Sequence, residues 1–221
     1  MSKETEETAV EWSLRTWQER HDKCYFPTSI QHHDWYVYPT APPWFAEYAA
    51  PTPDDVVCEI GAGYGEWMIP IAPTVAEICG FDIAPNLVSM AAAKFAEHGA
   101  DNARMCMGDG TSIPFARESF SLVYSISVFQ HIPREMVHGY IRETDRVLRP
   151  GGRAVLHFRN ADNVGPYPTP AADIQAGHTG DFSCGWTADQ VADAGRAVWS
   201  EFRVVDIGLH LLLIGQKKVI A

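Results

Sequence analysis

Acidic and polar side chains follow four apolar runs of the sequence, each at the point where the run ends. Glu59 precedes a glycine turn over residues 61–65, Asp82 ends the second run, Asp109 and Gly110 follow the third, and Gln130 and His131 follow the fourth. Glycine at alternate positions of a turn lets the backbone bend sharply and approach a ligand without a Cβ in the way. Carboxylates accept hydrogen bonds from ligand hydroxyls and suit a positively charged ligand. The pattern therefore predicts a ligand site that is assembled from several segments of the chain.

Alternating strands and helices would bring these segments together. Strands are predicted over residues 56–60, 77–82, 103–108, 119–125 and 153–158, with helices over 64–72, 85–98 and 133–148 between them and a turn at 150–152. Such alternation predicts a mainly parallel α/β sheet with helices on both faces. Two further strands, 202–207 and 210–215, join tightly around Gly208, which predicts an antiparallel last pair. Thr187 and Gln190 have the spacing of a capping box and predict the start of another helix.

Five ordered motifs resemble those of the class I S-adenosylmethionine-dependent methyltransferases, in particular their small-molecule branch. The motifs are Glu59-Ile60-Gly61-Ala62-Gly63-Tyr64-Gly65, Gly80-Phe81-Asp82-Ile83, Met107-Gly108-Asp109-Gly110, Phe120-Ser121-Leu122-Val123-Tyr124-Ser125 and Leu148-Arg149-Pro150-Gly151-Gly152. The resemblance covers residues 54 to 218, approximately. It implies the family's Rossmann-like fold, a doubly wound, seven-stranded, mainly parallel sheet with helices on both faces and an antiparallel last strand. It also implies S-adenosyl-L-methionine as the cofactor.

The same resemblance assigns cofactor-binding residues. It implies that Gly61, Ala62 and Gly63 pack against the methionine part of the cofactor, and that Glu59 lies near its amino group or orders the turn. Asp82 would accept hydrogen bonds from the ribose hydroxyls, Ile83 would pack on the adenine, and Asp109 and Gly110 would lie beside it; Ser125 and Gln130 complete the predicted set.

A nicotinamide-dinucleotide enzyme is the main competing interpretation of the glycine turn. Asp82 lies about 20 residues beyond the glycines, as the dinucleotide fingerprint requires. However, Glu66 stands where the fingerprint has its last glycine, and an acidic side chain beside a pyrophosphate is unfavourable. A cationic sulfonium cofactor suits Glu59, Asp82 and Asp109 better.

Candidate acceptor and catalytic residues follow the fourth strand and occupy the segments outside the regular pattern. His131 is the candidate general base or orienting group, because an imidazole titrates near neutrality. A histidine that caps the following helix or bonds to the backbone is an equal alternative. Tyr36 is the second catalytic candidate, and Tyr38, His33, Arg159 and Tyr167 are the predicted substrate contacts. The aromatic residues could attract a cationic amine or serve only in packing, and Arg159 could hold an anionic group or form a surface ion pair.

Composition limits the partners. The 221 residues carry a formal net charge of −11, which disfavours nucleic-acid binding, since neutralising phosphates needs clustered Lys and Arg. Five cysteines without a Cys-x-x-Cys pair indicate free thiols in a reducing compartment. With no signal segment and no membrane-spanning run recognised, we expect a cytoplasmic monomer or homodimer that acts on a small molecule and holds no metal.

One α/β domain with an added N-terminal cap is expected. Residues 1–43 combine a predicted helix over 5–21 with an aromatic, proline-rich segment, and form either a cap over the active site or a cover for one face of the sheet. Residues 44–221 form the cofactor-binding domain, with a short helix over 44–49 and an inserted loop at about 160–185. The expected reaction is in-line methyl transfer to N or O of a small-molecule acceptor. Cyclisation or aminocarboxypropyl transfer with the same cofactor, or a cofactor-binding partner without its own acceptor site, remain alternatives.

Overall fold

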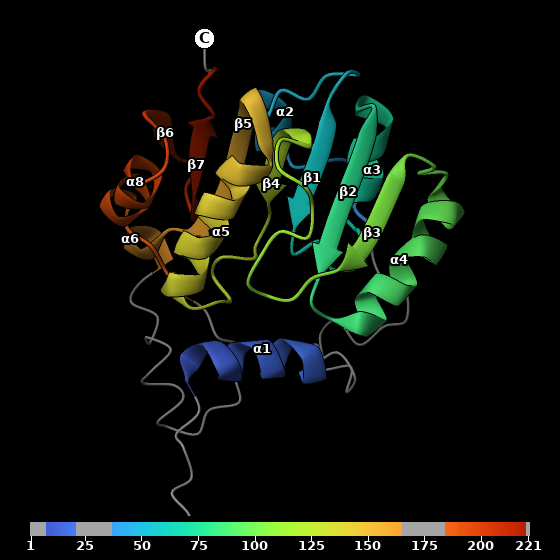
Figure 1. Cartoon of the computed structure of the whole chain (residues 1–221), viewed down its shortest axis with the longest axis horizontal. Coiled ribbons are helices and arrows are strands. Elements are labelled where there is room, and N and C mark those ends of the chain that lie inside the picture. Colours follow the sequence, from blue (N-terminus) through green and yellow to red (C-terminus); the bar gives the residue numbers. More distant parts are fainter. Residues whose placement is uncertain (1–7, 21–36, 165–183, 220–221) are drawn as a thin grey trace, which may run out of the picture.

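The protein is built around one seven-stranded sheet. The computed structural model describes residues 8–20, 37–164 and 184–219. Its strands are β1 (Val56–Ile60), β2 (Glu77–Asp82), β3 (Ala103–Met107), β4 (Phe120–Ser125), β5 (Leu148–Arg159), β6 (Glu201–Asp206) and β7 (His210–Gln216). Their order across the sheet is β3-β2-β1-β4-β5-β7-β6 (Figure 1). The strand order reverses at β1, which has β2 on one side and β4 on the other, and this is where open α/β sheets bind ligands.

The expected mixture of parallel and antiparallel pairing is confirmed. Strands β1 to β5 pair in parallel, whereas β7 runs antiparallel to both of its neighbours, β5 and β6. The turn between β6 and β7 contains Gly208 with a φ of 90°. A hairpin turn of this kind needs a positive φ, which glycine adopts without a steric penalty.

Helices cover both faces of the sheet because successive strand side chains point to opposite faces. In β1, Val57 packs with a core formed under α2 (Pro43–Tyr48), α3 (Met68–Ile71) and α4 (Pro85–His98). Cys58 and Ile60 pack into the opposite core, under α5 (Arg134–Val147) and α8 (Ala188–Arg196). Apolar side chains therefore alternate between two cores, and β1 lies at the centre of both.

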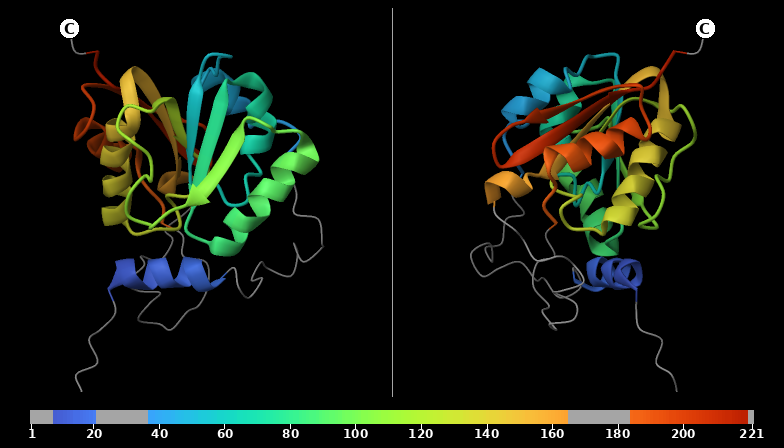
Figure 2. Two further views of the ribbon diagram at one scale, coloured as in Figure 1. Left: turned by 45° about the vertical axis from the view of Figure 1, so that its right-hand side comes forward. Right: turned by 90° about the vertical axis from the view of Figure 1, so that its left-hand side faces the viewer.

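Helix α1 (Ala9–Arg20) has a different position, beyond the ends of the strands. In all three views of Figures 1 and 2 it crosses below the carboxyl ends of the central strands instead of packing on a face of the sheet. Thus the predicted N-terminal helix forms, and it lies over the carboxyl ends of the strands, where the sequence motifs converge.

Two predicted elements differ from the structure. The helix expected over residues 64–72 is limited to the four residues of α3, followed by a short 3-10 helix, Ala72–Thr74, because the chain is still in the glycine turn at Gly65, whose φ is 86°. The turn expected at 150–152 lies inside β5, where the pairing with β4 shifts from Phe120–Leu148 to Leu122–Arg153. The residues between form a bulge, and Gly151 accommodates it with a φ of 80°.

The predicted start of α8 is confirmed in atomic detail. The Thr187 hydroxyl accepts the backbone N–H of Gln190 at 3.3 Å, and the Gln190 side chain accepts the backbone N–H of Thr187 at 3.1 Å. After β5 the chain forms one helical turn, α6 (Ala161–Val164). Across the described ranges, no helix is long and apolar enough to cross a membrane.

Candidate active site

The glycine turn after β1 brings the backbone against two neighbouring segments. Gly61 and Gly63 have φ values of 63° and 58°, which side-chain-bearing residues rarely adopt. A Cβ at Gly61 would lie 2.7 Å from Val128, in the segment that follows β4, and a Cβ at Gly63 would lie 2.9 Å from Glu66 Oε2. The glycine turn therefore packs so closely against Val128 and Glu66 that a side chain at either glycine would clash.

Asp82, at the end of β2, is hydrogen-bonded to this turn. Its Oδ2 accepts the backbone N–H of Gly63 at 2.9 Å, and its Oδ1 accepts the N–H of Ala84 at 2.9 Å. Burial raises the pKa of the Asp82 carboxyl, while the N–H groups of Ala84 and Gly63 favour its charged form. Each carboxylate oxygen can accept more than one hydrogen bond, so both retain acceptor capacity for a ligand.

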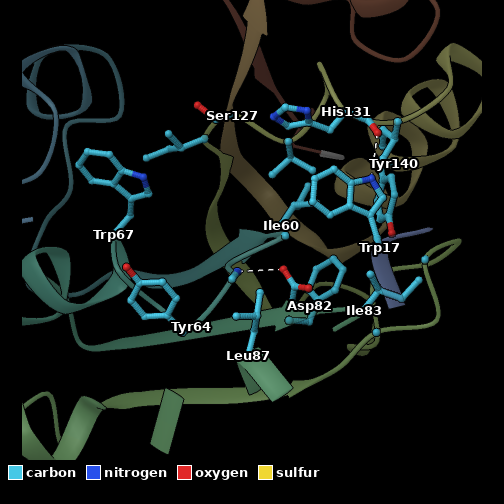
Figure 3. A pocket seen from close by; sticks show the side chains of 18 of the residues that line it. Trp17, Ile60, Tyr64, Trp67, Asp82, Ile83, Leu87, Ser127, His131 and Tyr140 are labelled. Atoms are coloured by element: carbon cyan, nitrogen blue, oxygen red, sulfur yellow. Dashed lines mark hydrogen bonds between the residues drawn. The ribbon is translucent and has the colours of Figure 1, made fainter. Parts of the chain in front are cut away.

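A cavity of about 380 Å³ opens at this edge of the sheet, between β1, β2, β4 and α1. It is lined by residues from six parts of the chain: Ser13, Leu14, Trp17, Tyr38, Ile60, Gly61, Gly63, Tyr64, Glu66, Trp67, Phe81, Asp82, Ile83, Leu87, Gly108, Gly110, Ile126, Ser127, Val128, His131, Ile132, Met136 and Tyr140. In Figure 3, Tyr64 and Trp67 lie on one side of the cavity, Trp17 and Tyr140 lie on the other, and Asp82 projects between them. The lining is mostly apolar, with two carboxylates and one imidazole.

His131 stands in the cavity wall beside helix α1. The Trp17 indole N–H donates to the His131 backbone carbonyl at 3.1 Å, and the two rings meet edge to face with centroids 5.3 Å apart (Figure 3). The Gln130 side-chain amide nitrogen lies 3.0 Å from His131 Nε2. With the amide as donor, Nε2 accepts and the imidazole carries its proton on Nδ1.

Two glutamates lie next to the turn without a basic partner among the described ion pairs. Glu59 is 1% exposed, and its Oε2 accepts the Tyr124 hydroxyl at 2.8 Å. Burial, together with the charge of Glu66, raises the pKa of Glu59 well above its usual range. Burial likewise raises the pKa of Glu66 to about 7. Beside the turn there are thus two carboxyl groups whose ionised forms the protein disfavours and which have no described basic partner.

The structure brings together only part of the predicted residue set. Seven predicted residues line the cavity: Gly61, Gly63, Asp82, Ile83, Gly110, His131 and Tyr38. Six do not: Glu59, Ala62, Asp109, Ser125, Gln130 and Arg159. The remaining three, Tyr36, His33 and Tyr167, lie outside the described residues.

Asp109 illustrates why strand ends alone do not define a site. Its carboxylate turns into its own loop, where it accepts the N–H groups of Thr111 and Ser112, both at 2.8 Å, and the Ser112 hydroxyl at 2.9 Å. Although partial burial opposes the shift, these hydrogen bonds lower the pKa of Asp109. Its role in this structure is to hold the loop that presents Gly110 to the cavity.

Several lining residues were missed by the sequence patterns. Trp17 and Ser13 belong to α1, which the sequence predicted only as part of either a cap over the site or a cover for one face of the sheet. Trp67 stacks face to face on Tyr38 with ring centroids 3.6 Å apart, a pairing between residues far apart in sequence. Glu66 was the one residue with a usable signal, since an acidic residue interrupts an otherwise glycine-rich turn.

Ser127 is a further lining residue, and its backbone is held in a strained conformation. Its φ is 58°, and its N–H donates to Nδ1 of His157 at 3.2 Å. His157 is 4% exposed, stacks on Trp44 with centroids 5.5 Å apart, and has the His210 ring 4.2 Å away. Burial, together with His210, lowers the pKa of His157 to about 3, so the ring is neutral and Nδ1 acts as an acceptor.

Comparison with known proteins agrees with this fold. A family model described as a methyltransferase domain matches residues 57–152, from β1 to the bulge of β5. Residues 57–152 thus form a methyltransferase domain of the class I S-adenosylmethionine-dependent type. The matched segment contains the glycine turn, Asp82, Asp109 and His131.

Individual relatives share the central part of the methyltransferase. The sterol 4-C-methyltransferase strm-1 of Caenorhabditis elegans is 33% identical over 106 residues, which are 47% of this chain and 31% of that protein. The match thus spans less than half the length of this curated relative. Helix α1 and the last two strands fall outside the matched family segment.

Solved structures resemble the methyltransferase over more of its length. A SAM-dependent methyltransferase from Methanosarcina mazei superposes with a TM-score of 0.67 at 19% identity, over 82% of this chain and all of that one. The [4+2]-cyclase SpnF superposes with a TM-score of 0.66 at 16% identity, over 96% of this chain and 97% of that one. At such identities the similarity shows the fold and leaves the reaction open.

The residues present fit the family's cofactor. S-adenosylmethionine carries a sulfonium and an ammonium group, and the cavity offers Glu66 and Asp82, with no Lys or Arg among its described lining residues. The Oε2 atom of Glu66 is buried and finds no hydrogen-bond partner among the described residues. A cationic ligand would satisfy this atom, whereas the phosphates of a dinucleotide would be repelled by both carboxylates.

Proposed function

We propose that this methyltransferase transfers a methyl group from S-adenosylmethionine to a nitrogen or oxygen atom of a small-molecule acceptor. The observation that carries the proposal is the composition of the cavity. It has carboxylates on the side of the glycine turn and a mostly apolar wall with one imidazole, His131, on the side of α1. Such a division suits a cationic cofactor and an uncharged or cationic acceptor that meet in one enclosed space.

Asp82 and the glycine turn are proposed to hold the cofactor. Both oxygens of Asp82 are already fixed by backbone N–H groups, so the carboxylate is oriented before a ligand arrives. Its remaining acceptor sites suit the two ribose hydroxyls, and Ile83 and Gly110 supply apolar contact for the adenine. Asp109 contributes indirectly, because it fixes the loop that carries Gly110.

The chemistry places few demands on the protein. When bound, the cofactor supplies a methyl carbon that is already activated by the positive sulfur. The chain's task is then to hold the acceptor at about 3 Å from that carbon and to exclude water. His131 is the proposed general base for an acceptor that enters protonated, since it lines the cavity. To accept that proton, Nε2 would have to exchange its hydrogen bond with the Gln130 amide for one with the acceptor.

Residues 1–43 are proposed to act as a cap. Helix α1 contributes Ser13, Leu14 and Trp17 to the cavity wall, which supports this role over a cover for one face of the sheet. Tyr38 stacks on Trp67 at the opposite side. Acceptors would then enter and leave as the cap opens, which would make the N-terminal segment the natural determinant of acceptor choice.

Product analysis tests the proposal. The protein would be incubated with S-adenosylmethionine and a panel of amines, phenols and carboxylates. Mass spectrometry would follow both the product of the cofactor and the product of the acceptor. Methyl transfer yields S-adenosylhomocysteine and an acceptor that is one methylene heavier. Methylthioadenosine as the coproduct would instead indicate cyclisation or aminocarboxypropyl transfer, the second candidate, because a fold does not fix its reaction.

A further inference from the structure

Glu66 is a buried acid in the cavity wall to which the proposed function assigns no ligand group. It follows the glycine turn directly and lies beside Gly63, where a Cβ would come within 2.9 Å of Oε2. Backbone N–H groups of Tyr64 and Glu66 itself stabilise the carboxylate, yet Oε2 has no hydrogen-bond partner in the described structure. A buried, unpartnered carboxylate oxygen is costly, so its retention calls for a partner that arrives from outside.

The ionisable groups around Glu66 are all acids or phenols. Asp82 on β2 acts on Glu66 through its negative charge, and Glu66 in turn raises the pKa of Glu59 on β1. Tyr64 and Tyr124 also lie within its electrostatic range. No Lys or Arg is found among the described residues of the cavity wall. The described residues of the cavity wall therefore offer the Glu66 carboxylate no attractive positive charge, and a cationic ligand would supply one.

The missing partner must both be cationic and donate hydrogen bonds. The cofactor has two cationic groups, and only its α-ammonium has N–H donors, since the sulfonium has no hydrogen on sulfur. Three donors on the ammonium match the unpartnered Oε2 of Glu66, whereas the sulfonium could offer it charge alone.

We propose that Glu66 binds the α-ammonium group of the cofactor's amino-acid part and thereby selects ligands that carry this group. Gly63 connects this contact to Asp82, because its N–H donates to Asp82 and its missing side chain makes room for Oε2. The two carboxylates would thus bind the two ends of one ligand from either side of a single glycine.

A consequence is that cofactor binding is linked to a proton. Because burial raises the pKa of Glu66 to about 7, the free protein holds a proton there in part of its molecules at neutral pH. Binding of an ammonium requires the ionised form, so binding below this pH releases a proton and the affinity falls as the pH falls. The effect amounts to roughly tenfold between pH 7.5 and pH 6.

The test compares three ligands in calorimetric titrations of the full chain and of Glu66→Gln. S-adenosylmethionine carries both cationic groups, S-adenosylhomocysteine carries only the ammonium, and methylthioadenosine carries neither. We expect Glu66→Gln to weaken the first two by about tenfold or more at pH 7.5 and to leave methylthioadenosine within twofold. Glu135→Gln, at an exposed position of α5, removes the same charge outside the cavity and should change none of the three.

Each other outcome has a distinct meaning. A loss restricted to S-adenosylmethionine would assign Glu66 to the sulfonium and overturn the inference, and equal loss of all three ligands would overturn it as general damage to the site. Unchanged affinities in Glu66→Gln would also overturn it. If the unaltered protein bound none of the three, the cofactor assignment on which the inference rests would fail first.

Titration of the unaltered protein at pH 7.5 and pH 6, in two buffers of different ionisation enthalpy, provides a second measurement that needs no variant. We expect S-adenosylhomocysteine to bind with proton release and to lose about tenfold in affinity at the lower pH. Methylthioadenosine should show neither effect. A pH-independent affinity would contradict the proposal.

Discussion

The Trp17 indole N–H donates to the backbone carbonyl of His131, 114 residues further along the chain, at 3.1 Å. This bond connects α1 to the segment that follows β4, and the edge-to-face contact of the two rings adds to it. Since both residues line the cavity, the position of the cap and the position of the candidate base are set together. The cap is therefore coupled to the site in part through a hydrogen bond that a substitution can remove.

Removing this contact should weaken ligand binding without unfolding the domain. Trp17→Phe keeps an aromatic ring and loses the N–H donor, so we expect S-adenosylhomocysteine affinity to fall about three- to tenfold. Calorimetry measures the change. Trp199→Phe is the matched control, because the Trp199 indole donates to Asp145 at 2.9 Å outside the cavity wall. It should lower the melting temperature and leave the affinity unchanged; equal affinity losses in both variants would refute the coupling.

His131→Ala should separate cofactor binding from turnover. If His131 is the base, kcat for a protonated acceptor should fall by roughly 10²-fold or more, while S-adenosylhomocysteine affinity stays within about threefold. The pH profile of kcat should also lose the limb that reports the imidazole. Turnover equal to that of the unaltered protein would leave His131 with the packing and backbone role alone.

His157 should make stability depend on pH in a defined direction. Its pKa is lowered to about 3 by burial and by His210, whereas an unfolded histidine titrates near 6.5, so the unfolded state binds more protons between these values. The contribution of neutral His157 is therefore complete above about pH 6.5 and is lost as the pH falls toward 3. Urea unfolding at pH 7.5, 6.5 and 5.5 measures the slope.

His157→Phe should reduce that slope and also cost about 1–3 kcal/mol at pH 7.5, since the Ser127 N–H loses its acceptor. An unaltered slope in the variant would assign the pH dependence to other groups. His98→Phe, at an exposed position on α4, provides the comparison and should retain the full slope.

Asp55 should stabilise the end of the sheet that lies opposite the cavity. It accepts hydrogen bonds from Arg153 on β5, from Ser121 on β4 and from Thr52, and Arg153 also donates to the carbonyl of Ala49. Although burial opposes the shift, the bonds from Arg153, Ser121 and Thr52 lower the pKa of Asp55. A lowered pKa gives stability that is present above the unfolded value near 3.9 and lost as the pH falls below it.

Asp55→Ala should accordingly cost about 3 kcal/mol at pH 7, because Arg153 would be left without its partner. Denaturant unfolding measures this cost, and the difference from the unaltered protein should shrink below about pH 4. The exposed pair Asp193–Arg196 supplies the contrast: Asp193→Ala should change stability by less than about 0.5 kcal/mol. Equal costs for the two substitutions would contradict the role of burial.

Most of the fold could be predicted because its signals are local. Apolar runs, proline at the start of α4 and the capping box of α8 each act within a few residues, and all three appear where they were expected. The length of α3 could not be predicted from the same signals. Gly65, which ends the turn with a positive φ, packs against Phe95, 30 positions away, where a Cβ would lie 2.4 Å from the ring.

The site was predicted less completely because side-chain direction depends on contacts between distant segments. Asp82 and Asp109 both follow strand ends, yet Asp82 borders the cavity and Asp109 closes its own loop. The position of Trp17 depends on where a whole helix docks, which no short pattern encodes. Glu66 could be recognised as unusual in sequence, but its buried, unpartnered oxygen is visible only in the structure.

The central claim is that this cavity binds S-adenosylmethionine through Asp82. The most direct test is calorimetric titration of the unaltered protein and of Asp82→Ala with S-adenosylmethionine and S-adenosylhomocysteine, with NADH as the competing cofactor. The account predicts binding of the first two to the unaltered protein, no binding of NADH, and a loss of at least 1.5–3 kcal/mol in Asp82→Ala, as expected for a charge-assisted hydrogen bond. Binding of NADH alone, or equal affinities in the two proteins, would contradict it.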